Sequence, residues 1–188
     1  MAARTLAHAL TNVLNPFVIF TALYASVAFS EVDASKALLY VTLELLAAAT
    51  VAGYVLLMQR HSRVGNFWIS ARAERLTPAL FLLGAFVGLL TILRLLDAPE
   101  DLFLLTLSMG LASAAVALIT VILKASAHCA VAGHAATAGL LLLGPLGSGF
   151  LLALPFVIWS RIVLRAHTAL ETLAGAGVGA GCALLFLA

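Results

Sequence analysis

The sequence predicts an all-α protein, a polytopic bundle of transmembrane helices, on the basis of its composition and its apolar segments. Of the 188 residues, 64% are hydrophobic and 10% are charged, and the mean hydropathy is +1.16. Because a soluble domain usually carries about a quarter charged residues, this chain has too few charges to cover a water-facing surface. No linker or low-complexity tract divides the chain, so we expect residues 1–188 to form a single domain.

Seven apolar segments are bounded by charged residues or by Pro and Gly. Each holds roughly 17–22 residues, against the ~20 that a helix needs to cross a bilayer core. The short connection Gly144-Pro145-Leu146-Gly147 leaves the exact number open, and we expect about six to seven spans. The first residues lack a clear small-residue cleavage site, which favours a retained helix over a signal peptide. The segments lie near 13–30, 37–58, 78–95, 102–123, 128–144, 148–165 and 168–187.

The basic residues are unevenly divided between the two faces that alternating spans define. Lys36 and Arg94 fall on one face, which leaves eight of the ten basic residues for the other. The positive-inside rule predicts that this basic face is cytoplasmic, in an integral protein of a prokaryotic plasma membrane. A phosphate-binding site would collect the same residues on either side, so the compartment stays open. The basic face receives Arg4, Arg60, Arg63, Arg72, Arg75, Lys124, Arg161 and Arg165.

The most informative polar stretch begins at Trp159 and contains two pairs of residues at helical spacing. His167 and Glu171 are four residues apart, so on a helix the carboxylate can reach the imidazole and fix its tautomer. Arg161 and Arg165 are also four apart, and guanidinium groups donate well to phosphate oxygens. This pattern favours a nucleophilic or general-base histidine beside an anion site, and an interfacial salt-bridge cluster is the alternative.

Two further polar groups belong to the same predicted face. Arg72 and Arg75 precede Pro78, which suits the first turn of the next helix, although a basic loop touching lipid headgroups remains an alternative. Lys124, Ser126 and His128 lie where one apolar segment ends and the next begins.

Two further features are interpreted as structural and not as parts of a functional site. The glycines between Gly175 and Gly181 are predicted to allow close helix packing. Glu44 lies inside an apolar segment and should be protonated or paired, with no partner evident from the sequence.

Together these groups resemble the type 2 phosphatidic acid phosphatase superfamily of membrane lipid phosphatases. Its third motif, Ser-Arg-x5-His-x3-Asp, is matched in spacing by Ser160-Arg161, His167 and Glu171, with Glu in place of Asp. The core of its second motif, Pro-Ser-Gly-His, is similar to Ser126-Ala127-His128, with Ala in place of Gly. Arg72 and Arg75 before Pro78 resemble its first motif only loosely, and the likeness covers roughly residues 60–185.

The resemblance implies a mechanism and an activity. His167 would attack phosphorus to form a phosphohistidine, Glu171 would orient it, and His128 would protonate the leaving group. Arg161, Arg72, Arg75 and Lys124 would bind the phosphate, with Ser126 donating a hydrogen bond. No metal or other cofactor is implied. The substrate would be a lipid phosphomonoester or diphosphate, of the polyprenyl diphosphate, phosphatidate or phosphatidylglycerophosphate type.

The same residues also bear on other functions and on possible partners. A prenyltransferase would need paired Asp-rich motifs for Mg²⁺, and the chain has no such pair, since DDxxD is absent and DxxxD occurs once, at Asp97 and Asp101. A catalytically inactive relative, acting as a lipid-binding, transport or assembly subunit, is the main alternative. We expect contact with membrane lipids and no nucleic-acid partner, since the net charge is only +2. The Gly-rich last segment leaves a homo-oligomer open.

Overall fold

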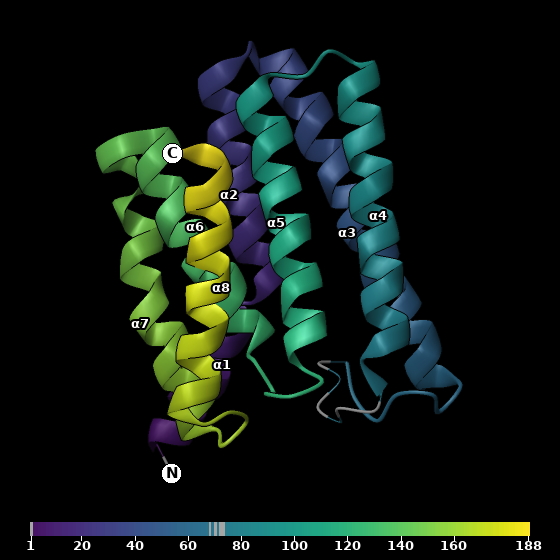
Figure 1. Ribbon diagram of the computed structural model, residues 1–188, viewed down its shortest axis with the longest axis vertical. Coiled ribbons are helices and arrows are strands. Elements are labelled where there is room, and N and C mark those ends of the chain that lie inside the picture. The colour runs from purple at the N-terminus through teal and green to yellow at the C-terminus, as the bar shows by residue number, and fades with distance from the viewer. Residues whose placement is uncertain (1, 68, 70, 72–73) are drawn as a thin grey trace.

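The seven expected segments each form a helix, and an additional short helix precedes them (Figure 1). The computed structural model describes residues 2–67, 69, 71 and 74–188, and this part of the chain contains helices and no strand, which confirms the all-α prediction. The elements are α1 (Ala2–Val13), α2 (Pro16–Glu31), α3 (Ala34–Arg60), α4 (Leu76–Leu95), α5 (Glu100–Ile119), α6 (Ala127–Leu143), the 3-10 turn η2 (Gly144–Gly147), α7 (Ser148–Val163) and α8 (Ala169–Leu187).

The helices fit a polytopic membrane protein. By length and apolar composition, five helical segments of the described chain can cross a membrane, or six if the bent pair α1 and α2 is one span. One of the five runs from Ala127 to Val163 and includes α6, η2 and α7. The expected number of six to seven spans is therefore not confirmed.

The entry into α2 differs from the expected segment, which was placed from residue 13. The side chain of Asn15 accepts a hydrogen bond from the backbone N–H of Val18 at 3.0 Å, and Pro16 occupies the first turn. An Asn cap followed by Pro is a strong helix start. The chain therefore bends by 45° between α1 and α2, and α1 packs against α7.

Helices α2, α3, α4, α5 and α6 contact one another in a ring, and α8 packs against α5 and α6. The segments that follow α3, α5 and α7 lie together at one end of the bundle, which we call the loop end (Figure 1). The predicted polar groups sit in or beside these three segments. The alternation of helices thus brings them to the same end, as the charge pattern predicted.

Close packing of α8 on α6 joins two of these groups. An added Cβ at Gly175 would lie 2.4 Å from the carbonyl oxygen of Ser126, and one at Gly179 would lie 1.9 Å from that of Ala130. The packing predicted for Gly175 and Gly179 is confirmed. Gly177 and Gly181 face open space, so the packing predicted for them is wrong.

Candidate functional site

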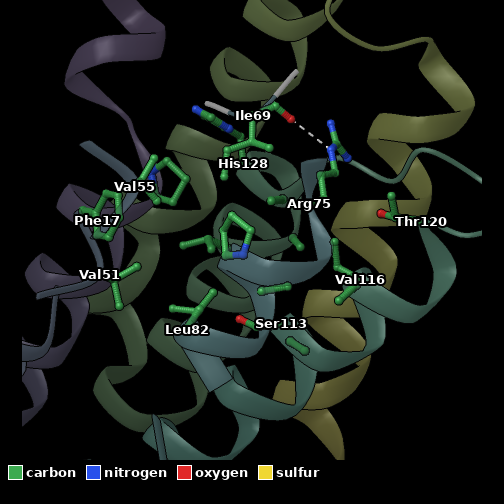
Figure 2. A pocket seen from close by; sticks show the side chains of 18 of the residues that line it. Phe17, Val51, Val55, Ile69, Arg75, Leu82, Ser113, Val116, Thr120 and His128 are labelled. Atoms are coloured by element: carbon green, nitrogen blue, oxygen red, sulfur yellow. Dashed lines mark hydrogen bonds between the residues drawn. The ribbon is translucent and has the colours of Figure 1, made fainter. Parts of the chain in front are cut away.

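A cavity of about 1020 Å³ lies within the ring of helices and reaches the loop end. Its wall at the loop end is polar, and farther in it is mainly apolar, with Val51, Leu82 and Val116 on three different helices (Figure 2). Such a cavity suits a ligand with an anionic head and an apolar chain. The polar residues that line the loop end of the cavity are Arg75, Thr120, Lys124, His128, Arg161, Arg165 and His167.

His167 is held by two acceptors. Its Nδ1 lies 3.0 Å from the backbone carbonyl oxygen of Lys124 and 3.4 Å from Oε2 of Glu171. Because neither acceptor can donate in the ionised site, Nδ1 carries the hydrogen, which leaves the lone pair of the neutral ring on Nε2. Burial, with the positive charge of Arg161 next, lowers the pKa of His167 to about 4. The imidazole is therefore neutral at pH 7, as a nucleophile requires.

The contact between His167 and Glu171 is not made along a helix, as the four-residue spacing suggested. Helix α8 begins at Ala169 with Thr168 as its N-cap, so His167 lies before the helix. Thr168 and Glu171 form a capping box, in which the Thr168 N–H donates to Glu171 Oε2 at 2.9 Å. The capping box thus fixes the Glu171 carboxylate at the start of α8, where it contacts His167. Glu171 stands behind His167 and does not line the cavity.

The segment from Lys124 to His128 is joined to the segment that carries His167 and Glu171 by hydrogen bonds to backbone carbonyl groups. The N–H of Ser126 donates to the carbonyl of Glu171 at 3.0 Å, and Lys124 Nζ donates to the carbonyl of Ala166 at 3.4 Å. These bonds place His128, in the first turn of α6, in the same cavity wall as His167. Ser126 was predicted to bind phosphate. The structure buries it completely as the N-cap of α6, where its hydroxyl accepts from the Cys129 N–H at 3.4 Å, outside the cavity lining.

Ala127, which stands where the family pattern has Gly, is the first residue of α6. The described non-Gly residues with positive φ are Ser62, Ile69, Asp97 and Arg165. Ala127 is not among them, so its backbone does not need the freedom of glycine.

Arg161 is a buried cation in the cavity wall. It is 8% exposed, and its Nε has no hydrogen-bond partner among the described residues. Within the described chain, the one ion pair joins His167 and Glu171, so Arg161 has no carboxylate partner there. A buried guanidinium without a counter-ion is costly, and an anion in the cavity would relieve that cost. Arg165, expected one helical turn further on, follows the end of α7 and is exposed.

The group formed by Arg72 and Arg75 is described only in part. Arg72 lies outside the described residues. Arg75 was expected in the first turn of α4, but the helix begins at Leu76 and Arg75 is its N-cap residue. Its Nε donates to the carbonyl of Ile69 at 3.1 Å, and both residues line the cavity (Figure 2). Arg75 therefore reaches the same cavity as Arg161 from a different segment.

Three partners were missed by sequence reasoning. The Lys124 carbonyl that holds His167 is a backbone atom, so no residue type signals it. Thr11 on α1 donates to Ser160 on α7 at 3.0 Å, which fixes the turn that carries Arg161. The partner of Glu44 is Thr21, whose hydroxyl lies 3.1 Å and 2.9 Å from the two carboxyl oxygens. Among the described residues, no three His, Cys, Asp or Glu side chains gather where they could hold a metal ion.

Comparisons with protein-family models, curated proteins and solved structures found no match to this chain.

Proposed function

We propose that this protein is a membrane lipid phosphatase that transfers phosphate from a lipid phosphate or diphosphate to His167 and then to water. The proposal rests on one observation, an anion-binding site whose wall also holds a neutral imidazole. Arg161 is buried in the cavity wall without a carboxylate partner in the described chain, and His167 lines the same wall with its Nδ1 hydrogen already engaged. The apolar remainder of the cavity accounts for a lipid chain. The likeness to the type 2 phosphatidic acid phosphatases supports the same reaction.

In the first step, Nε2 of His167 attacks phosphorus, and the bond between phosphorus and the leaving oxygen breaks. Arg161, Arg75 and Lys124 stabilise the charge on the phosphoryl oxygens. His128 donates a proton to the leaving oxygen, and the anionic substrate itself stabilises the imidazolium form that this requires. In the second step, water loses a proton to His128 and attacks phosphorus, and the phosphorus–nitrogen bond breaks to release phosphate and neutral His167.

The decisive experiment traps the intermediate. The detergent-purified protein is incubated with a lipid phosphate labelled on phosphorus, in EDTA, and quenched in alkali, which preserves phosphohistidine. We expect label on the protein and release of phosphate. His167→Ala should remove both, and His128→Ala should slow release by roughly a hundredfold to ten-thousandfold.

His61→Ala is the matched control, because His61 is exposed, follows α3 and lies outside the cavity lining. It should behave as the unmodified protein. Turnover that requires Mg²⁺ and survives His167→Ala would refute the mechanism. Tight binding of lipid phosphates without any turnover by a folded protein would refute the enzyme and favour a binding or transport subunit.

A further inference from the structure

The cavity contains a second polar position, far from the histidines. Glu44 on α3 lines the cavity but is only 3% exposed. Glu44 is the one described carboxylate that lines this cavity. An ionisable side chain inside a membrane bundle is costly to desolvate and usually marks a ligand or a proton path. Glu44 therefore indicates a second point of contact with the ligand, in addition to the phosphate site.

The hydrogen bonding of Glu44 is incomplete. Among the described residues its one hydrogen-bond partner is Thr21, whose single hydroxyl hydrogen is shared by the two carboxyl oxygens. A carboxylate has about four acceptor sites, so most of its capacity is unused. Tyr24, one turn after Thr21 on α2, is fully buried, and its hydroxyl has no partner among the described residues either. A packing role alone would be met by an uncharged pair, so Glu44 keeps the capacity for a further hydrogen bond.

Helical geometry gives the depth of this position. On α3, Val55 is the cavity residue nearest the loop end, and Glu44 lies 55 − 44 = 11 residues before it, about 16 Å along the helix axis. Figure 2 places Val55 near the level of His128, with Val51 and Leu82 farther in. A substrate with its phosphate at His167 would therefore pass an apolar stretch before its chain reaches Glu44.

We propose that Glu44, positioned by Thr21, recognises a hydroxyl group on the hydrocarbon chain of the substrate, roughly 16 Å from its phosphate. This inference rests on the proposed function, because the phosphate site sets the orientation of the chain. A hydroxyl fits better than an ammonium group. The ammonium would be repelled by the cations at the loop end and would have to pass the apolar wall as an unpaired charge. A plain chain would leave the carboxyl unsatisfied, and a site built for a hydroxyl rejects such an analogue strongly.

The test compares two monoalkyl phosphates that differ only in a chain hydroxyl at this distance. The unmodified protein should favour the hydroxylated phosphate in kcat/KM by roughly tenfold to a hundredfold. Glu44→Leu should abolish the preference and keep activity on the plain chain. Glu44→Gln, which keeps the volume, should retain part of the preference, and Thr21→Val should weaken it.

Thr42→Val is the matched control, since Thr42 is exposed on α3, bonds its own helix at Leu38 and does not line the cavity. The same pair of chains is also compared as non-hydrolysable phosphonates by titration calorimetry, which reports binding even if the protein hydrolyses nothing. Failure of the proposed function would appear as absent turnover with the hydroxyl preference intact. Equal binding of both phosphonates by the unmodified protein, or a preference that survives Glu44→Leu, would overturn the inference.

Discussion

At the scale of single residues, the site depends on which atom of His167 is occupied. The Lys124 carbonyl and Glu171 both lie at Nδ1, at 3.0 and 3.4 Å, and the other nitrogen is left for chemistry. The spacing of His167 and Glu171 predicted their contact, but the contact arises because the capping box of Thr168 and Glu171 holds the carboxylate at the helix start, beside His167. The backbone carbonyl could not be predicted, since it depends on where the α5–α6 connection runs.

The protonation of His167 leads to a prediction on pH. Burial lowers the pKa of its imidazole to about 4, so the neutral, nucleophilic form predominates above that pH. As pH falls, kcat/KM should therefore hold through pH 6 and decline only as the pH approaches 4, because kcat/KM reports the free enzyme. NMR titration of the imidazole carbon of His167 measures the ionisation of His167 without any contribution from ionisation of the substrate. A midpoint near 6.5 would contradict the prediction.

The charge of Glu171 can be separated from its geometry. Glu171→Gln keeps the capping box, because Gln serves at this position as Glu does, and Lys124 still orients the ring. We expect a loss of about tenfold in the rate of phosphoenzyme formation, within the range of one charge-assisted hydrogen bond. Glu171→Ala removes both cap and carboxylate and should lose more. Rapid-quench labelling measures the rate, and thermal unfolding reports the lost cap. Equal losses in the two variants would show that the charge alone matters.

At the scale of elements, the start of α6 is docked on α8 through glycine. The apolar segments predicted seven of the eight α-helices. The spacing of the glycines predicted the close packing of Gly175 and Gly179, but the same prediction is wrong for Gly177 and Gly181. The sequence did not predict α1 as a separate helix, because its mixture of Arg, His, Thr and Asn lacks the apolar length of a span. It also extended the segment that became α5 to residue 123, whereas α5 ends at Ile119. The chain after Ile119 leaves the helix so that Lys124 can reach His167.

Gly175 tests this docking. An added methyl would meet the Ser126 carbonyl at 2.4 Å, and a backbone atom cannot rotate away as a side chain can. Gly175→Ala should therefore shift the start of α6, move His128 away from His167, and lower activity more than stability. Gly177→Ala is the control: with nothing within 4 Å of its Cβ, it should leave activity unchanged and stabilise the helix slightly. Phosphate release and thermal unfolding are measured on both. Full activity in Gly175→Ala would contradict the docking.

At the scale of the whole molecule, the alternation of the helices accounts for the position of the basic residues at the mouth of the cavity. Alternating helices return the segments after α3, α5 and α7 to the loop end, where the cations line the mouth of a cavity enclosed by α2 to α6 (Figures 1 and 2). The alternation of apolar segments along the sequence was enough to place these segments at one end of the bundle. The cavity itself was not predictable, because it depends on which helices close the ring. For the same reason the pairing of Glu44 with Thr21 could not be read from the chain.

A lipid chain inside this ring should be sensitive to the width of the cavity. Ser113 on α5 lines its middle, near Leu82 on α4 (Figure 2). In Ser113→Phe, each methylene group that no longer fits forfeits about 0.8 kcal/mol, so exclusion of two or three lowers kcat/KM for a long-chain phosphate by roughly tenfold to a hundredfold. A short-chain phosphate should be hydrolysed as before, because the loop end is untouched. Leu111→Phe, on the exposed side of α5, is the control and should affect neither substrate. If Ser113→Phe slowed both substrates equally, or neither, the chain would have to lie outside the ring, in contact with the bilayer.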